Sequence, residues 1–480
     1  MINRVLEQFI EDKCPFEVKG GQRAVIARVA DFLLSDDRDG ICLLRGYAGT
    51  GKTSLLSALV RAMHEMKQKT VLMAPTGRAA KVFFLQSGHQ AYTIHKRIYR
   101  QKSFSGETDN YTRNVNLQKH TLFIVDEASM ISAASSGTAF GGTGCLLDDL
   151  VQFVYSGEGC RLLLVGDPAQ LPSVGEELSP ALSREVLEGY GLHVWEAGLT
   201  EVVRQQAESG ILWNATRLRR LITEGGRDGL PRIRLNGFPD IRRVPGDELI
   251  DTLEEAYSKS GTDQTIVVTR SNKRANVYNN GIRGRILGRE EELTGGDRLL
   301  VARNNYFWAG GQKDCPFDFL ANGDMAEVRR VRRTREMYGF RFADVLLRLP
   351  DYEDMELEAT VLLDTLQSEA PALTRVQADA LFAAVEADYM DVTVRRERMQ
   401  KLKSDPYFNA LQVKYAYAVT CHKAQGGQWQ RVFVDQGYMT DDMFAPDYFR
   451  WLYTAFTRAT DVLYLVNWPS GQIEEGGAEV

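Results

Sequence analysis

The residues best suited to chemistry lie near the start of the chain, where glycines, a lysine and hydroxyl groups follow one another closely. Residues 46–53 read G-Y-A-G-T-G-K-T and fit the pattern G-x-x-x-x-G-K-[ST]. Glycines let backbone N–H groups turn inward around phosphates, the lysine reaches the β- and γ-phosphates, and the last hydroxyl is a ligand for Mg²⁺. The residues that we expect to hold a nucleotide here are Gly46, Gly49, Thr50, Gly51, Lys52, Thr53 and Ser54.

The segments on either side of this loop supply the context that the pattern requires. The apolar run 41–44 predicts a buried strand, and residues 54–63 have helical periodicity. The loop would therefore lie at a helix N-terminus, whose partial positive charge favours phosphate. A chance match in an ordinary glycine-rich turn is the alternative, and the order strand, loop, helix argues against it.

Two further strand ends carry side chains that could act on the same nucleotide. Asp126 and Glu127 follow the apolar run 122–125. Asp126 would hold Mg²⁺ through water, and Glu127 would orient or deprotonate the attacking water. Gln170 lies in G-D-P-A-Q-L-P after the run 162–165, and its uncharged amide could contact a γ-phosphate or its water. Alone, each would be an acidic strand end or a turn residue, so these interpretations depend on the upstream loop.

The apolar runs form a repeating pattern that predicts the fold class. Short apolar runs alternate with helical stretches, which is typical of an α/β fold with mostly parallel sheets. The expected strands lie at 41–44, 70–73, 122–125, 162–165, 265–268, 431–434 and 462–466. A chain of 480 residues is too long for one core, so two such domains fit the length better than one.

Composition excludes several other classes of protein. Hydrophobic residues make up 44% and aromatic residues 10% of the chain, which rules out disorder as the main state. The net charge of −6 excludes a wholesale basic nucleic-acid binder but allows a local basic groove. We expect no transmembrane helix and no secretory leader. The six cysteines contain no C-x-x-C pair, so reduced thiols and a cytoplasmic location are expected.

Further segments lie before and after the phosphate loop, in the order known from one family of motors. They are Gln22 within 21–24, and the segments 74–81, 93–96, 166–172, 199–205, 418–426 and 452–459. Together with the phosphate loop they resemble the motifs of superfamily 1 helicases. The sequences of these motifs are most similar to those of the RecD-like and Dda-like group, superfamily 1B. The matches run from residue 22 to residue 459.

The resemblance implies an ATP-dependent DNA helicase with two RecA-like motor domains and with ATP and Mg²⁺ between them. Gln22 would read adenine. Arg204 and Arg458 would reach ATP from the second domain as arginine fingers that stabilise transition-state charge. Outside these motifs, either would be a surface arginine or part of a salt bridge. The expected catalytic residues are Lys52, Glu127, Gln170, Arg204 and Arg458.

The resemblance also implies a track for single-stranded DNA. The residues at the positions that meet the strand in this family are Thr76, Arg78, Lys81, His95, Lys96, Thr420, His422 and Lys423. Hydroxyls, imidazoles and cations suit this role because they bind phosphate without reading sequence. Singly, His95 and His422 would be satisfied core histidines, and their place within two motifs reverses that interpretation.

Two stretches interrupt the α/β rhythm. Residues 100–117 predict a β-hairpin, where related helicases carry a pin that splits the duplex. Phe104 and Tyr111 could stack there on the junction base pair or be incidental aromatics of a solvated hairpin. Residues 316–408 predict a small β-barrel with helical elaboration, where the family carries an SH3-like barrel. Its run of five arginines within 329–335 could contact DNA or cover an exposed edge strand. Residues 132–144 predict a mobile surface loop.

These expectations combine into one organisation of the chain. The first motor domain would comprise 1–95 and 118–195, with a pin at 96–117. The second would comprise 196–315 and 409–480, with the barrel insert at 316–408. We expect a monomer that acts on single-stranded and fork DNA in replication, recombination or repair. The resemblance alone implies 5′ to 3′ movement. A translocase that displaces proteins and an RNA or hybrid helicase remain as alternatives.

Overall fold

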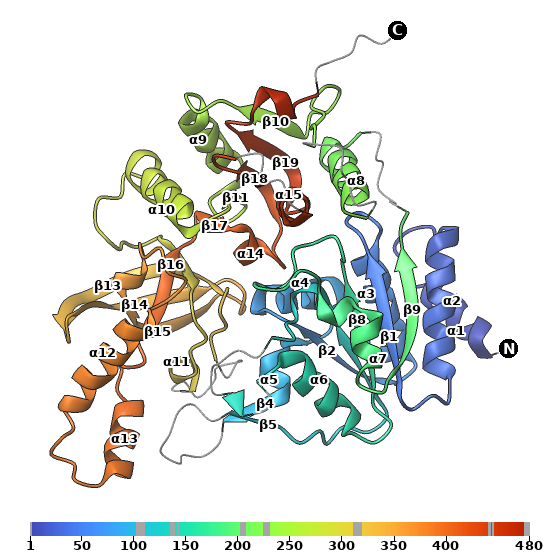
Figure 1. Ribbon diagram of the computed structural model, residues 1–480, viewed down its shortest axis with the longest axis horizontal. Coiled ribbons are helices and arrows are strands. Elements are labelled where there is room, and N and C mark those ends of the chain that lie inside the picture. The colour runs from blue at the N-terminus through green and yellow to red at the C-terminus, as the bar shows by residue number, and fades with distance from the viewer. Residues whose placement is uncertain are drawn as a thin grey trace.

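The first half of the chain folds around a parallel sheet in the computed structural model (Figure 1). Six strands lie in the order β3-β2-β6-β8-β1-β9, and every neighbouring pair is parallel. The strands are β1 (Gly40–Gly46), β2 (Lys69–Ala74), β3 (Ala91–Thr93), β6 (Thr121–Val125), β8 (Arg161–Gly166) and β9 (His193–Leu199). The four strands expected in this half are confirmed.

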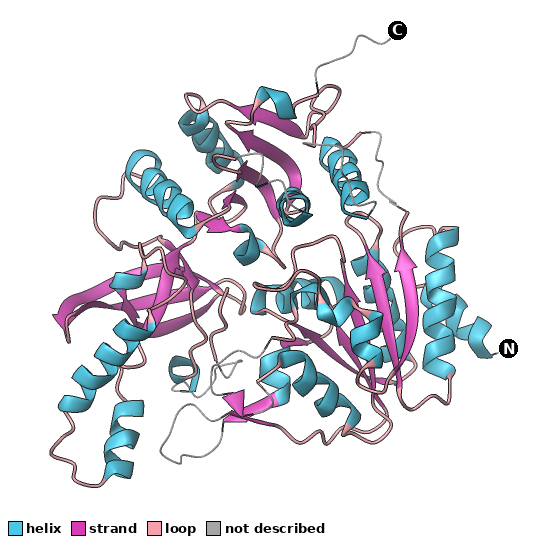
Figure 2. Ribbon diagram, viewed as in Figure 1, coloured by secondary structure: helices cyan, strands magenta, loops and turns pink. Residues whose placement is uncertain are grey.

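Helices cover both faces of this sheet (Figure 2). They are α1 (Ile2–Glu11), α2 (Gly20–Leu34), α3 (Lys52–Glu65), α4 (Gly77–Ser87), α5 (Ile94–Ile98), α6 (Leu146–Tyr155) and α7 (Arg184–Glu188). In β1, Cys42 and Leu44 pack against α1 to α4, whereas Ile41 and Leu43 pack against α5 to α7. Because both faces are buried, the strands read as unbroken apolar runs rather than as alternating patterns.

A second parallel sheet forms in the second half of the chain. Its five strands lie in the order β10-β19-β18-β11-β17. They are β10 (Ile241–Val244), β11 (Thr265–Thr269), β17 (Ala418–Thr420), β18 (Trp429–Asp435) and β19 (Ala459–Val466). The helices that accompany it are α8 (Gly210–Thr223), α9 (Leu249–Ser260), α10 (Asn272–Gly281), α14 (Cys421–Ala424) and α15 (Pro446–Phe456). Two parallel sheets, and thus an α/β fold, are confirmed.

A closed β-barrel is inserted between β11 and β17. Its strands are β12 (Arg298–Val301), β13 (Met325–Met337), β14 (Phe340–Leu349), β15 (Met355–Leu362) and β16 (Leu411–Tyr415). The short helix α11 (Phe307–Gly310) and the pair α12 (Arg375–Ala387) and α13 (Arg395–Lys403) decorate it (Figure 1). The expected insert, 316–408, leaves out β12 and β16. That boundary was wrong, because both strands are short apolar runs whose barrel partners lie far away in the sequence.

The stretch expected to form a hairpin contains two short strands. Strands β4 (Tyr99–Gln101) and β5 (Tyr111–Arg113) pair antiparallel, and β7 (Phe140–Gly141) adds to β5 in parallel. Part of the expected loop at 132–144 is therefore a strand. The structure describes residues 2–101, 111–134, 140–141, 144–201, 208–223, 231–310, 319–439, 443 and 446–474. Phe104 lies outside the described residues.

Two expectations about the whole chain can be examined in these residues. Within the described ranges, no helix is both long enough and apolar enough to span a bilayer. Five cysteines fall within the described part of the chain, and all of them are free thiols.

Candidate nucleotide and nucleic-acid sites

The phosphate loop connects β1 to the N-terminus of α3. Gly51 caps the helix with a φ of 80°, and Gly49 has a φ of 76°. Side-chain-bearing residues rarely adopt such angles, so the loop requires glycine at both positions. Lys52 is the first residue of α3, and its Nζ donates to the Gly46 carbonyl at 3.1 Å. The lysine is thus folded over the loop that would hold the phosphates.

Gln22 reaches the same loop from α2. Its Nε2 donates to the Thr50 carbonyl at 3.4 Å, and its Oε1 accepts from the Lys19 backbone N–H at 3.1 Å. The side chain is 3% exposed. Thr50 Oγ1 in turn donates to the Tyr47 carbonyl at 2.8 Å. The structure therefore brings Gln22 to the phosphate loop, 28 residues away in the chain.

The acidic pair expected to manage metal and water follows β6 directly. Asp126 Oδ1 accepts from the Glu127 backbone N–H at 2.8 Å. Burial and the neighbouring Glu127 charge raise the pKa of Asp126 to about 6, although Lys52 opposes the shift. Glu127 has a φ of 53°, a left-handed conformation that costs a residue with a side chain of order 1–3 kcal/mol. Such strain is typical of functional sites.

Two buried oxygens at this site have no hydrogen-bond partner among the described atoms. They are Glu127 Oε2 and Gln170 Oε1. A buried polar atom without a partner is unfavourable, so such atoms indicate a missing ligand or water. The carboxylate of Asp126 and the hydroxyl of Thr53 are oxygen donors of the kind that Mg²⁺ prefers. These residues fit a bound nucleotide with Mg²⁺.

The two expected arginine fingers have different outcomes. Arg204 lies outside the described residues. Arg458 is 3% exposed, and its guanidinium donates to backbone or hydroxyl oxygens of its own domain. Those acceptors are Thr454 O at 3.0 Å, Gly427 O at 3.1 Å and Thr457 Oγ1 at 3.3 Å. A buried guanidinium must pair its donors, so a role at ATP requires Arg458 to exchange these partners.

Sequence reasoning missed the residues of the second domain that contact the phosphate loop. Tyr453 OH accepts from the Ala48 backbone N–H at 2.8 Å. The Arg219 guanidinium lies 4.4 Å from the centroid of the Tyr47 ring, within cation–π range. Tyr453 lies inside a motif that was recognised, but no local pattern indicates what its hydroxyl contacts. The contact of Arg219 joins residues 172 positions apart and leaves no signal in the sequence.

The expected DNA-binding residues of α4 are engaged within the protein. Thr76 caps α4, because its Oγ1 accepts from Ala79 N at 3.2 Å. The Arg78 guanidinium lies 4.0 Å from the centroid of the Trp429 ring, in the second domain. Lys81 Nζ lies 3.7 Å from Asp351 Oδ1, in the barrel. Two cations of this helix thus meet different parts of the second half of the chain.

His95 and Lys96 lie on α5, away from those contacts. Burial lowers the pKa of His95 to about 4, so the imidazole is neutral at physiological pH. The neutral ring can donate one N–H to a phosphate oxygen, but it carries no positive charge to attract the phosphate. Lys96 Nζ lies 5.7 Å from the centroid of the Tyr92 ring.

The expected DNA-binding residues of the second domain lie around α14. Thr420 is its N-cap residue, and His422 and Lys423 lie within it. Burial lowers the pKa of both, to about 8 for Lys423, where the charge of Lys414 adds to the effect. Lys423 Nζ donates to Asn322 Oδ1 of the barrel. The barrel therefore contacts candidate DNA-binding lysines of both sheet domains.

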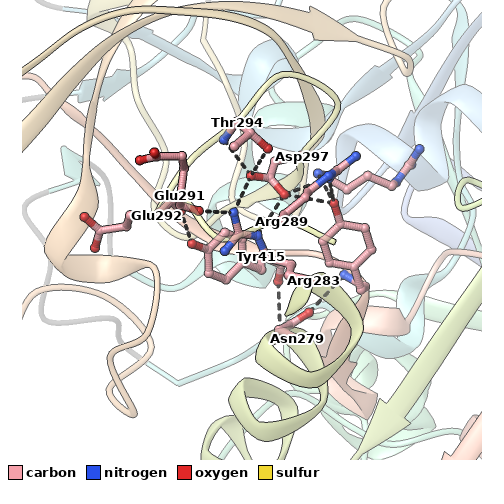
Figure 3. A network of polar contacts seen from close by, with 10 residues as sticks. Asn279, Arg283, Arg289, Glu291, Glu292, Thr294, Asp297 and Tyr415 are labelled. Carbon is pink, nitrogen blue, oxygen red and sulfur yellow. Dashed lines mark hydrogen bonds and ion pairs between the residues drawn. The ribbon is translucent and has the colours of Figure 1, made fainter. Parts of the chain in front are cut away.

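A network of polar contacts fixes the barrel to the second domain (Figure 3). Asp297, which is 0% exposed and directly precedes β12, accepts from Arg283 through both nitrogens of a fork at 2.9 Å. Arg289 Nη1 adds a bond at 2.8 Å and Tyr417 OH one at 3.0 Å. These donors hold the pKa of Asp297 below its usual range despite burial. Because Arg283 follows α10, the network joins that helix to both connections of the barrel.

Comparison with known proteins identifies both sheet domains. Residues 17–225 match the AAA domain family, and residues 415–466 match the UvrD-like helicase C-terminal domain family. Over 175 residues the chain is 31% identical to the ATP-dependent RecD2 DNA helicase of Deinococcus radiodurans, covering 36% of this chain and 21% of that one. The chain is thus similar to DNA helicases in both of its sheet domains.

Longer alignments extend over most of the chain. An uncharacterized protein of Acanthamoeba polyphaga mimivirus is 22% identical over 494 residues, covering 88% of this chain and 94% of that one. An uncharacterized protein of Methanocaldococcus jannaschii is also 22% identical, covering 89% of this chain but only 37% of that one. Among solved structures, Bacteroides Pif1 with ADP-AlF3 and single-stranded DNA gives a TM-score of 0.46 at 15% identity, covering 92% of each chain. Candida albicans Pif1 gives 0.41 at 16% identity, covering 96% of this chain and 97% of that one.

Proposed function

We propose that the protein is a superfamily 1B helicase that hydrolyses ATP to move along single-stranded DNA, from 5′ to 3′, and to unwind duplex DNA ahead of it. The observation that carries the proposal is the bond between Ala48 of the phosphate loop and Tyr453 of the second sheet domain. A nucleotide held on this loop lies where the two domains meet. Its binding and hydrolysis can therefore change how the domains are held together, which is what a motor requires.

The chemistry follows from residues of the first domain. Lys52 would contact the β- and γ-phosphates, and the amides around Gly49 and Gly51 would cradle them. Thr53 and Asp126 would hold Mg²⁺, which neutralises phosphate charge when bound. Glu127 would orient the attacking water with its unpartnered oxygen.

Three other groups would complete the ATP site. Gln170 would contact the γ-phosphate or the attacking water through its own unpartnered oxygen. Gln22 would read adenine. Arg204 and Arg458 would supply the arginine fingers, Arg458 after exchanging its present partners.

The proposed track for single-stranded DNA crosses both motor domains. Thr76, Arg78 and Lys81 would hold the strand on the first domain, together with His95 and Lys96 further along. On the second domain it would meet Thr420, His422 and Lys423. Several of these side chains now donate to backbone carbonyl or side-chain amide oxygens, and a phosphate offers a comparable acceptor.

Two added elements would act on the duplex. The strand pair β4–β5 supports a pin that separates the strands, with Phe104 as its stacking residue. The five-stranded barrel supports an SH3-like domain that guides the strand. The first motor domain would then comprise 1–95 and 118–195. The second would run from 196 and resume after the barrel, whose strands lie within 298–415.

The test is steady-state ATPase activity with and without single-stranded DNA, together with unwinding of forks that carry either a 5′ or a 3′ tail. We expect DNA to stimulate hydrolysis strongly and only the 5′-tailed fork to be unwound. Lys52→Ala should abolish both activities, because the lysine meets the transferred phosphoryl group. Hydrolysis stimulated equally by RNA would contradict the DNA assignment, and hydrolysis without any nucleic-acid dependence would contradict the motor.

A further inference from the structure

One face of helix α15 makes hydrogen bonds to the first sheet domain. Arg450, Tyr453 and Thr454 lie at positions i, i+3 and i+4, so their side chains leave the same side of the helix. Arg450 Nη1 donates to the Pro168 carbonyl, and Thr454 Oγ1 accepts from Leu171 N at 2.8 Å. Both partners belong to the loop after β8 that carries Gln170. The second domain thus grips this loop at its start and at its end.

Tyr453 adds a contact that the other two residues do not make. Its hydroxyl donates to Asp167 Oδ2 at 2.7 Å and accepts from Ala48 N at 2.8 Å. Asp167 belongs to the same loop as Gln170, and Ala48 belongs to the phosphate loop. A single hydroxyl of the second domain therefore joins two separate parts of the nucleotide site in the first.

The surroundings make this hydroxyl hard to replace. Tyr453 is 1% exposed and Asp167 is 0% exposed, so water has little access to the bridge. Burial raises the pKa of Asp167, while the Lys52 charge and the Tyr453 bond work against that shift. A hydrogen bond to a buried carboxylate is stronger than one between neutral groups. If packing alone were required here, phenylalanine would serve without the cost of burying a hydroxyl.

We infer that Tyr453 is a positioning residue of the ATPase cycle, whose hydroxyl keeps the phosphate loop and the Gln170 loop in register with α15. Movement of the second domain is thereby transmitted to the side chain that meets the γ-phosphate. Tyr453 acts through Asp167 and Ala48 and touches no nucleotide itself. The inference rests on the proposed function, because it assigns a step in that ATP hydrolysis.

The test compares Tyr453→Phe with the parent helicase. The variant keeps the buried ring and removes only the hydroxyl. We expect the DNA-stimulated kcat to fall about tenfold, the usual consequence of losing one hydrogen bond to a charged group. The KM for ATP and the affinity for single-stranded DNA should stay close to those of the parent. The number of base pairs unwound per ATP should also fall, because domain movement and hydrolysis are no longer held in step.

Tyr448→Phe is the matched control. Tyr448 lies on the same helix, is 2% exposed, and donates its hydroxyl to Gln436 of the second domain itself. This control should keep the parent's kcat and coupling. Thermal unfolding of both variants reports any loss of folded protein. An equal loss of kcat in both would mean that helix packing is responsible and would overturn the inference, as would an unchanged kcat in Tyr453→Phe.

A double-mutant cycle with Asp167→Asn examines whether Tyr453 acts through that carboxylate. Residues that work through one bond give non-additive effects. We expect the double variant to lose little more kcat than the worse single variant, and strictly additive losses would overturn the inference. Lys52→Ala in the same assay separates the two claims. A parent protein without ATPase activity would contradict both the proposed function and this inference. An active parent with an inactive Lys52→Ala variant and an unaffected Tyr453→Phe variant would contradict this inference alone.

Discussion

The protonation state of Lys423 affects how well the proposed track can bind DNA phosphate. Burial and the nearby Lys414 lower its pKa to about 8, and its present partner, the Asn322 amide oxygen, is neutral. The free protein therefore holds this ammonium charged below pH 8 and loses the proton as pH rises through that value. A DNA phosphate favours the charged form, so binding at higher pH must take up a proton.

This gives a prediction about pH at the scale of one residue. Affinity for single-stranded DNA should fall by up to about tenfold between pH 7 and pH 9, as the free lysine loses its proton. Fluorescence anisotropy with a labelled oligonucleotide at fixed ionic strength measures it. Lys423→Arg keeps its charge throughout and should flatten the profile. A parent affinity that does not vary with pH would exclude Lys423 from the track. Lys414 has a pKa that is also about 8, so any slope that remains in Lys423→Arg is assigned to Lys414.

Residue types and spacing revealed much of the nucleotide site. The phosphate loop, Asp126, Glu127 and Gln170 can be found because each lies at the end of an apolar strand that the sequence shows clearly. The hydrogen-bond partners of Arg458 could not be predicted in the same way. Its partners are chiefly backbone carbonyls, and the position of a carbonyl depends on how the chain turns rather than on which residue carries it.

At the scale of elements, the contact between helix α4 and the barrel is tight enough to test. A Cβ added at Gly77, the first residue of α4, would lie 2.2 Å from Asp324 Oδ1 of the barrel. Asp324 is itself buried, and burial raises its pKa to about 7. It cannot withdraw freely, because it is held by Tyr352 OH at 2.6 Å and by Ala321 N at 2.7 Å.

Gly77→Ala should therefore destabilise the protein, by about 1–3 kcal/mol as is usual for overpacking a filled site. Thermal unfolding measures the change. Gly281→Ala is the control, since Gly281 ends α10 in helical conformation and an added Cβ meets nothing within 4 Å. That variant should be neutral or more stable by about 0.5–1 kcal/mol. Equal melting temperatures for both variants would show that the barrel does not press on α4.

Some strands could be predicted from the sequence and others could not. The difference is whether a strand's position depends on nearby residues or on partners far away in the sequence. The strands of both parallel sheets stand out because burial on two faces makes each an apolar run. Strands β13 and β14 stand out because a short turn at Gly339 joins them. The edges of the barrel do not stand out, because β12 pairs with β16 across more than a hundred residues and nothing local records that pairing.

At the scale of the whole molecule, the barrel links the two sheet domains. The Asp297 network fixes it to the second domain, while its turns reach α4 of the first domain (Figure 1). A strand of DNA lying on Lys81 and Lys423 must displace the barrel residues that now contact them. On the proposed track, the barrel would compete with DNA for these cations, and because it is fixed to the second domain it would move with that domain when displaced.

Asp351→Asn tests that competition. The carboxylate lies 3.7 Å from Lys81 Nζ, a partly exposed pair that contributes up to about 1 kcal/mol. Removing its charge should free Lys81 for phosphate and tighten binding of single-stranded DNA by up to about fivefold. The salt dependence of binding should steepen as well, because one more cation then meets the strand. Asp354→Asn, at an exposed carboxylate that pairs with Arg348 within the barrel, is the matched control and should leave affinity unchanged. If Asp351→Asn weakens binding instead, the barrel holds Lys81 in place for DNA rather than competing with it.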